Sequence, residues 1–326
     1  MPWLEKPGHI LLNNKSMKHL LSLATWTSEE IQTVLNLAKE IKAHPENYRK
    51  VMEFKTLMMI FEKPSLRTRV SFEVAATQMG GHAIYYDVST SPLGKKETIE
   101  DTAKCSGRFV DIIMARMFKF SDIKALADNA GVPVIDALSE QNHPCQIMAD
   151  LLTMLEKKGD LKGLKMAYFG DCNNNVTYSL MHGAALVGMN IDVACPDITE
   201  VKPLNQFVNE AKKIARATGS QIRVLHNAAE AAKDCDVIYT DSWMSYHITK
   251  DREAERKSIL LPYQVNTELM RQAKTDCLFM NCLPAMRGYE QTAEVIDGPQ
   301  SIVFDQAENR LHAQKAILKY LLDQSI

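Results

Sequence analysis

The sequence lacks an excess of charge of either sign. Its 38 Lys and Arg residues nearly balance its 40 Asp and Glu residues, which gives a net charge of −2. A chain so close to neutral has no general attraction to nucleic acid or to an anionic membrane surface. We therefore expect no nucleic-acid partner, and any site for an anion must be built locally from a few arginines and helix ends.

Long hydrophobic runs and targeting segments are also missing. No stretch approaches the roughly 20 apolar residues that are needed to span a bilayer. The opening segment, MPWLEKPGHILLNNKSM, has neither the basic head nor the sustained apolar run of a secretory signal. These absences predict a soluble, cytoplasmic protein with no membrane partner.

Paired cysteines are absent as well. The seven cysteines are odd in number, scattered along the chain and without CxxC spacing. This pattern argues against a disulfide framework and against a zinc site, and it fits a reducing compartment. We expect no bound metal.

Neither of the two common glycine-rich phosphate loops occurs. GxxxxGK[ST] is absent, and the apolar run at 166–170 is followed by Asp-Cys-Asn-Asn-Asn instead of GxGxxG. Bulky Asn residues stand where glycines would let a pyrophosphate approach, which argues against a dinucleotide cofactor and a dehydrogenase. We expect no organic cofactor. These absences do not argue against a small phosphorylated substrate.

What the sequence does contain is a regular alternation of short apolar runs and longer amphipathic stretches. The expected strands are 56–61, 83–88, 111–116, 132–137, 165–171, 190–196, 221–225, 236–241, 276–282 and 301–305. Such alternation predicts an α/β fold with parallel sheets flanked by helices, and the length of 326 residues favours two domains.

The expected domains meet near the helical pattern Gln146 to Lys158 and the turn Gly159-Asp160. We assign residues 1–150 to the first domain and residues 151–306 to the second. The last helical pattern, Ala307 to Leu322, is expected to pack back on the first domain, so that residues 307–326 belong with it.

The loop after the first expected strand has the features of an anion site. Ser65 is a plausible helix N-cap, and the free backbone N–H groups of the turn that it opens can bind an anion. Arg67 and Arg69 add guanidinium donors, which suit the bidentate geometry of phosphate. The alternative is a capped helix with solvated arginines.

Two further strand ends carry polar side chains. Arg116 closes the run DIIMAR, and the loop after 132–137 places His143 and Gln146 around a helix start. Ligands of open parallel sheets bind beyond the carboxyl ends of the strands. His143 is therefore a candidate donor to a carbonyl oxygen, although a single His is more often structural.

These segments resemble the signatures of the aspartate/ornithine carbamoyltransferase family. Ser65-Leu66-Arg67-Thr68-Arg69 is similar to its Ser-x-Arg-Thr-Arg signature, and His143-Pro144-Cys145-Gln146 to its His-Pro-x-Gln loop. Further matches follow in family order at LGKKETIEDT (93–102), GDCNNNV (170–176), DSW (241–243), NCLP (281–284) and AENR (307–310). Each motif alone is weak, but seven in order form a strong signal.

The resemblance implies a set of residues for carbamoyl phosphate and for its reaction. The ligands that it implies are Ser65, Leu66, Arg67, Thr68, Arg116, His143, Gln146, Cys282, Leu283 and Arg310. Among these, Arg116, His143 and Cys282 are the implied catalytic residues. The segment from Leu93 to Glu97 would reach into a neighbouring subunit, which implies a homotrimer or a multiple of it.

For the acceptor, the resemblance favours L-ornithine, which would become citrulline in arginine metabolism. Asn173-Asn174-Asn175 resembles the ornithine type, and the implied ornithine ligands are Asn175, Asp241, Ser245 and Tyr246. Cys282 matches the Cys that lies near the δ-amine in that type.

The sequence departs from the ornithine pattern at two places. Tyr246-His247 replaces Met-Gly in the acceptor loop, and Asn281 stands where the family has His before Cys-Leu-Pro. LPAMRG (283–288) resembles the Leu-Pro-Ala-x-Arg-Gly pattern of putrescine carbamoyltransferases, so putrescine is an alternative acceptor. The retained Ser245 and the short tail favour ornithine. A catalytically silent binding or regulatory homologue is the alternative of another class, although every implied carbamoyl phosphate ligand is retained.

Overall fold

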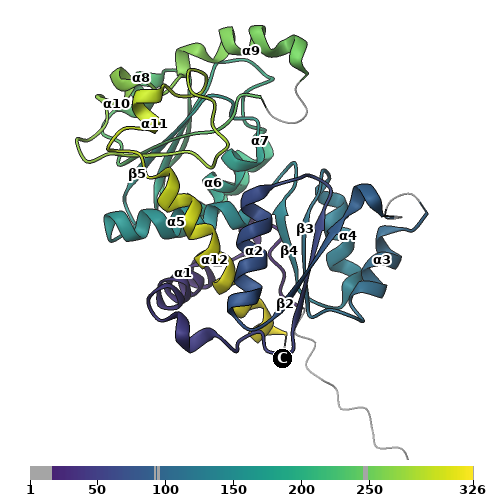
Figure 1. Ribbon diagram of the computed structural model, residues 1–326. Coiled ribbons are helices and arrows are strands. Elements are labelled where there is room, and N and C mark those ends of the chain that lie inside the picture. The colour runs from purple at the N-terminus through teal and green to yellow at the C-terminus, as the bar shows by residue number, and fades with distance from the viewer. Residues whose placement is uncertain (1–16, 92, 94–95, 245–248, 326) are drawn as a thin grey trace, which may run out of the picture.

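The computed structural model describes residues 17–91, 93, 96–244 and 249–325. Figure 1 shows two lobes, each built around its own sheet, with a long terminal helix that runs from one lobe to the other. The α/β fold with two sheets that the sequence predicts is confirmed.

The first lobe contains a sheet of four parallel strands in the order β2-β1-β3-β4. These strands are β1 (Thr56–Phe61), β2 (His82–Asp87), β3 (Ile112–Arg116) and β4 (Val134–Leu138). Side chains alternate between the two faces of a strand. Met59 accordingly joins the core on the side of helix α2 (Leu66–Gln78), while Met58 and Ile60 join the core beneath helices α3 (Ile99–Ser106) and α4 (Phe120–Ala130).

The second lobe contains a sheet of five parallel strands in the order β7-β6-β5-β8-β9. They are β5 (Lys165–Phe169), β6 (Asn190–Ala194), β7 (Ile222–Leu225), β8 (Val237–Thr240) and β9 (Leu278–Met280). The helices of this lobe are α6 (Asn175–Val187), α7 (Asn205–Thr218), α8 (Ala228–Ala232), α9 (Glu253–Leu260), α10 (Thr267–Met270) and α11 (Ala293–Ile296).

Three helices join the lobes: α1 (Ser28–Ala43), α5 (Pro144–Lys158) and α12 (Val303–Gln324). The chain passes from the first sheet to the second through α5 and returns through α12, which packs against α1, α2 and α5 (Figure 1). The predicted packing of the last helix on the first half of the chain is thus confirmed.

The prediction of a strand at 301–305 is wrong. Only Ser301 makes an isolated bridge, to Phe279, and α12 already begins at Val303. Leu278–Met280 is the edge strand at this point, and Ser301 touches it before the chain turns into a helix whose first turn buries Val303 and Gln306. The apolar residues 302–303 therefore serve a helix start and not a strand.

Local hydrogen bonds explain where the helices nearest the junction of the lobes begin. At α1, the Thr27 hydroxyl accepts from the Glu30 N–H and the Glu30 carboxylate accepts from the Thr27 N–H, which is a complete capping box. At α6, the Asn174 side chain accepts from the Thr177 N–H at 2.9 Å. Each cap satisfies a backbone donor that the helix leaves free.

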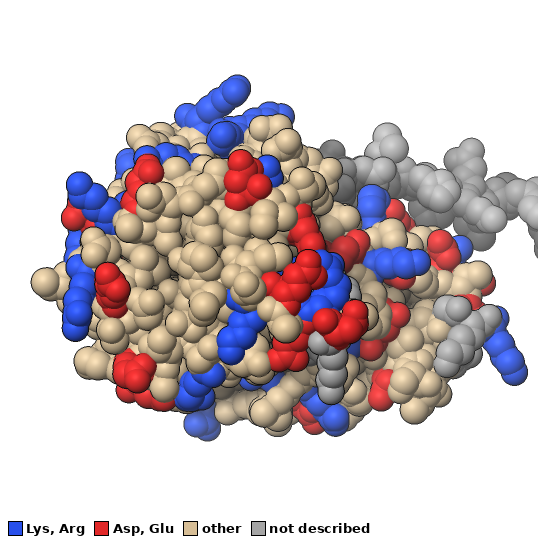
Figure 2. Space-filling model, turned by 90° about the horizontal axis from the view of Figure 1, so that it is seen from above, with Lys and Arg blue, Asp and Glu red and all other residues tan. Residues whose placement is uncertain are grey.

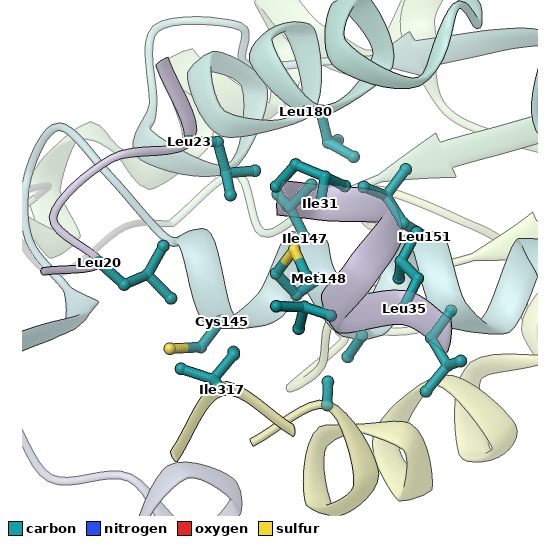
Figure 3. Packing of buried hydrophobic residues seen from close by; sticks show 14 of the residues in the cluster. Leu20, Leu23, Ile31, Leu35, Cys145, Ile147, Met148, Leu151, Leu180 and Ile317 are labelled. Atoms are coloured by element: carbon teal, nitrogen blue, oxygen red, sulfur yellow. The ribbon is translucent and has the colours of Figure 1, made fainter. Parts of the chain in front are cut away.

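One hydrophobic core extends through both lobes. Figure 3 shows side chains from α1, α5 and α12 meeting at the centre, among them Ile31, Leu151 and Ile317. The same cluster includes Leu57 of the first sheet and Tyr168 of the second. The two sheets are therefore stabilised in part by a shared interior. Their other faces pack in separate clusters, the first sheet with α3 and α4 and the second with α8, α10 and α11.

The surface mixes charges of both signs. Figure 2 shows Lys and Arg interspersed with Asp and Glu over the face that it presents, as the net charge of −2 would suggest. Within the described ranges, no helix combines the length and the apolarity that crossing a bilayer requires.

Candidate active site

The topology places two strand-order reversals opposite each other. In the first sheet the order reverses between β1 and β3, and in the second between β5 and β8. A crevice opens at such a point because the connections leave toward opposite faces of the sheet. The loops that follow β1, β3, β5 and β8 carry Ser65, Phe118, Asn173 and Asp241, all of which line one cavity.

This cavity has a volume of about 770 Å³ and is lined by both lobes. Most of the predicted site residues line it together: Ser65, Leu66, Arg67, Thr68, Arg116, His143, Gln146, Asn175, Asp241, Cys282, Leu283 and Arg310. Residues from opposite ends of the sequence thus form one cleft, which has the size of a small-molecule site.

The start of α2 has the geometry of an anion site. The Ser65 side chain caps the helix by accepting from the Thr68 N–H at 3.3 Å. The Leu66 side chain is 75% exposed, so any part that it plays in binding falls to its backbone N–H. Arg67 is half-buried and lines the cleft. Free N–H groups, the helix dipole and a guanidinium together favour a negatively charged group here.

Arg310 connects the last helix to the cleft. It is 2% exposed and donates to the Gln146 side-chain oxygen at 2.6 Å and to the Thr68 hydroxyl at 3.2 Å. Its Nε is buried and has no hydrogen-bond partner among the described residues. A buried guanidinium with an unused donor is costly unless an anion completes its set.

His143 is neutral at physiological pH. Burial lowers its pKa well below the ordinary value, and the positive charges of Arg310, Arg116, Arg67 and Lys63 lower it further. Its backbone N–H donates to the Ser179 hydroxyl at 2.8 Å, and its buried Nδ1 has no partner among the described residues. A neutral imidazole can donate one N–H to a carbonyl oxygen without carrying a charge of its own.

The second lobe contributes a carboxylate and a thiol. The Cys282 thiol donates to the Asp241 carboxylate at 3.1 Å. Burial raises the pKa of Asp241, and it raises the pKa of Cys282 well above the usual range, where the charge of Asp241 acts in the same direction. Cys282 is therefore a thiol and a hydrogen-bond donor, not a thiolate nucleophile.

The three consecutive asparagines have three different roles. Asn174 caps α6, and the Asn173 amide donates to the Glu200 carbonyl at 3.0 Å. Asn175 lines the cleft, and its side-chain NH₂ group donates to the Ser139 carbonyl at 2.6 Å. Of the three, Asn175 is thus the one whose side chain is held at the cleft between the two lobes.

The turn after β9 is held in place by Asn281. The Asn281 side chain accepts from the Leu283 N–H at 2.7 Å and donates to Gln291 at 3.0 Å. Leu283 has a φ of 56°, a left-handed conformation that costs a non-glycine residue about 1 kcal/mol. Asn281 is fully buried and does not line the cleft, so it supports the turn from behind.

Some predicted residues lie outside the described part of the chain. They are Ser245 and Tyr246, together with His247 of the same loop and Gly94 and Lys95 of the segment 93–97. Leu93 is described, and it is buried in the core on the side of α3 and α4.

Sequence reasoning missed Lys63, which lies in the same cleft. Its side chain is 8% exposed and its ammonium lies 4.5 Å from the centre of the Phe118 ring. Burial, and after it the charge of Arg116, lower the pKa of Lys63. Its place in the loop after β1, two residues before Ser65, could have identified it.

Chemically, the cleft offers a cationic half and a half with a carboxylate. The first lobe brings Lys63, Arg67, Arg116 and Arg310 together, and the second lobe faces them with Asp241. Among the described residues, no group of three or more His, Cys, Asp or Glu side chains is arranged to hold a metal ion. Such a cleft can hold an anion beside a cationic or amine-bearing molecule and stabilise negative charge between them.

Comparison with known proteins agrees with this geometry. Two family profiles match: "Aspartate/ornithine carbamoyltransferase, carbamoyl-P binding domain" over residues 18–156, and "Aspartate/ornithine carbamoyltransferase, Asp/Orn binding domain" over residues 162–321. The ornithine carbamoyltransferase of Pyrococcus abyssi is 48% identical over 94% of this chain and 96% of its own length. That of Anoxybacillus flavithermus is 49% identical over the same shares.

Solved structures give the same result. The ornithine carbamoyltransferase of Pyrococcus furiosus superposes with a TM-score of 0.89 at 47% identity, and the alignment covers 93% of this chain and 96% of that one. The ornithine transcarbamoylase of Giardia lamblia superposes with a TM-score of 0.87 at 40% identity, covering 94% and 99%. The chain belongs to the aspartate/ornithine carbamoyltransferase family.

Proposed function

We propose that this protein transfers the carbamoyl group of carbamoyl phosphate to the δ-amine of L-ornithine, giving citrulline and phosphate. The observation that carries the proposal is the single cleft in which cationic groups of one lobe face Asp241 of the other. The similarity over 94% of the chain to proteins named ornithine carbamoyltransferase supports ornithine as the acceptor.

Carbamoyl phosphate would lie against the first lobe. Its phosphate would receive hydrogen bonds from the N–H groups of the first turn of α2, from Arg67 and from Arg310, whose free Nε suits an anion. Arg116 would lie across phosphate and carbonyl, and His143 would donate to the carbonyl oxygen. Gln146, Cys282 and Leu283 would complete the pocket around the carbamoyl group.

Ornithine would bind on the second lobe. Asp241 would hold the α-ammonium group, since an ionised carboxylate there is stabilised by a bound cation. Asn175 would donate to the α-carboxylate. The Cys282 thiol, which already contacts Asp241, would lie near the δ-amine. Ser245 and Tyr246 would cover the acceptor.

The reaction would need little covalent chemistry from the protein. The neutral δ-amine attacks the carbonyl carbon, the carbonyl oxygen gains negative charge, and the bond to the phosphate oxygen breaks. The departing phosphate can accept the proton that the amine loses. Donors aimed at the developing oxyanion are each worth about 3 kcal/mol of barrier, and holding amine and carbonyl in contact contributes about 7 kcal/mol or more.

The acceptor assignment is tested by supplying carbamoyl phosphate with ornithine, putrescine, N-acetylornithine or aspartate and measuring phosphate release. We expect turnover with ornithine to exceed the other three. Faster turnover with putrescine would move the assignment to that amine, and the absence of release with every amine would indicate a silent homologue.

We further propose a homotrimer in the cytoplasm that serves arginine metabolism. The segment from Leu93 to Glu97 would reach a neighbouring subunit, which would bring further groups to each cleft. Light scattering should give three times the chain mass of 36.7 kDa, or a multiple of that value. A monomer with full activity would contradict this part of the proposal.

A further inference from the structure

Asp150 is a buried carboxylate on which three hydrogen bonds converge. It lies on α5, one helical turn after Gln146, and is completely buried. One carboxylate oxygen accepts from the side-chain amides of Gln146 at 2.8 Å and Gln306 at 2.7 Å, and the other accepts from the Tyr239 hydroxyl at 3.0 Å. Asp150 does not line the cleft.

This carboxylate determines which way two amide groups point. An ionised carboxylate can only accept hydrogen bonds, so the amide nitrogens of Gln146 and Gln306 must face it. Their oxygens then face outward. The partners of these two oxygens agree with this orientation. The Gln146 oxygen faces the Arg310 guanidinium and the Gln306 oxygen faces the Asn281 backbone N–H, and both of these groups can only donate.

The two outward oxygens hold groups on both sides of the cleft. Gln146 accepts from Arg310 at 2.6 Å, which fixes the guanidinium beside Thr68. Gln306 accepts from the Asn281 N–H at 3.1 Å, directly before the turn that presents Cys282 and Leu283. A continuous buried chain of hydrogen bonds therefore runs between the two lobes with Asp150 at its centre.

We infer that Asp150 is a positioning residue, which orients Gln146 and Gln306 and thereby aligns Arg310 and the Cys282-Leu283 turn with each other. The inference deepens the proposed carbamoyl transfer and rests on it. Without an acceptor at position 150, the Gln146 amide is free to turn its NH₂ group outward, where it would oppose a donor. The Gln306 amide would keep only the Tyr239 hydroxyl, at 3.0 Å, as an acceptor for its NH₂ group. Burial raises the pKa of Asp150 to about 6, and its three donors favour the ionised form.

The test compares Asp150→Ala, Asp150→Asn and Gln306→Leu with Asp192→Ala as the matched control. Asp192 is also a buried aspartate, but it is paired with Arg223 and lies on β6 away from the cleft. For each protein, kcat and KM for both substrates are measured at pH 8 and well below the melting temperature. The Kd of inorganic phosphate is measured by calorimetry.

We expect Asp150→Ala to lower kcat about 100-fold, the size of effect that a misplacement of about 1 Å produces. It should also weaken phosphate binding about tenfold or more, because Arg310 loses its alignment. A mere loss of nearby negative charge would instead tighten phosphate binding. Asp150→Asn should recover most of the activity, because its oxygen can still accept from both glutamines while its NH₂ donates to Tyr239. The control should lose stability and keep kcat.

Gln306→Leu separates the two branches of the hydrogen-bond chain. It leaves the contact between Asp150 and Gln146 intact, so phosphate should bind as in the wild type while kcat falls about tenfold or more. This variant decides the question if Asp150→Ala does not fold. Unchanged kcat in Asp150→Ala, or in Gln306→Leu where the former is unfolded, would overturn the inference. Absence of carbamoyl transfer in the wild type would instead overturn the proposed function, and the phosphate-binding comparison would still test Asp150.

Discussion

His143 shows how burial, reinforced by a cluster of cations, sets the protonation state of a single residue. It lies at the start of α5 among Lys63, Arg67, Arg116 and Arg310, which together with burial keep its imidazole neutral. The folded protein therefore does not take up the proton that an unfolded His binds below pH 6.5 or so. His143 thus makes folding less favourable as the pH falls.

From this sign we predict the pH dependence of stability. Between pH 7.5 and pH 5, wild-type protein should lose stability relative to His143→Gln, with a slope of up to about 1.4 kcal/mol per pH unit below pH 6.5. Urea unfolding of both proteins across this range measures the difference. Parallel stability curves would show that His143 binds its proton equally in both states.

The protonation state of Cys282 leads to a second prediction at the scale of one residue. Its pKa is raised well above the usual range, by burial and by Asp241, so almost no thiolate is present at pH 8. Iodoacetamide should therefore modify the exposed Cys105 and leave Cys282 unmodified, with activity retained. Peptide mass spectrometry reads both sites, and Cys105→Ser should abolish the labelling. Comparable labelling of Cys282 would contradict the protonated state.

Residues that line the cleft were easier to predict from sequence than those that support them from behind. Ser65 and Arg67 belong to a local sequence pattern, a helix cap followed by guanidinium donors, that indicates anion binding by itself. Asp150 and Gln306 carry no such signal, because their function depends on partners more than 80 residues away along the chain. Only the fold shows that one carboxylate serves both lobes.

At the scale of elements, Gly170 brings the end of β5 against the loop that follows β8 and carries Asp241 and Trp243. It has a φ of 112°, and a Cβ at this position would lie 2.6 Å from the indole nitrogen of Trp243. Trp243 follows Asp241 by two residues and is 1% exposed. A close approach of two loops thus depends on the absence of a side chain.

Gly170→Ala should therefore displace Trp243 and the neighbouring Asp241. We expect the KM for the acceptor to rise about tenfold or more while phosphate binding stays unchanged. Gly131 is a matched control, since it also has a positive φ, of 68°, but has no atom within 4 Å of the added Cβ. Gly131→Ala should cost only about 1 kcal/mol of stability. Equal acceptor KM values in the two variants would refute the steric explanation.

The sequence predicted the regular elements better than it predicted the chain between them. Strands β1 to β9 lie at or near the expected apolar runs. The central strands, such as β1 and β3, were the clearest, because buried parallel strands are apolar on both faces. The failure at 301–305 has a physical cause. An apolar run of this length also describes the buried first turn of a helix, and periodicity alone does not separate the two.

At the scale of the whole molecule, the shared core leads us to predict that the two lobes unfold together. Chains of this size commonly unfold one domain at a time. Here Leu151 of α5 belongs to a cluster that includes Leu57 of β1 and Tyr168 of β5. The two sheets should therefore lose protection together.

Leu151→Ala tests this prediction. The substitution should cost about 2–5 kcal/mol, and hydrogen exchange should show the same loss of protection in peptides that cover β1 and β5. A loss confined to one of these strands would show that the lobes unfold independently.

The route of the chain through α5 and α12 also bears on how new specificities can arise. The backbone leaves the first lobe once, after Lys158, and re-enters it once, at Val303. The whole second sheet thus lies between two junctions, so recombination can exchange it as one piece, together with the part of the cleft that Cys282 and Leu283 line. A graft from a relative with another acceptor must still present a backbone N–H to Gln306. The graft must also present a hydroxyl to Asp150, as Tyr239 does, and apolar side chains to the shared core, as Tyr168 does.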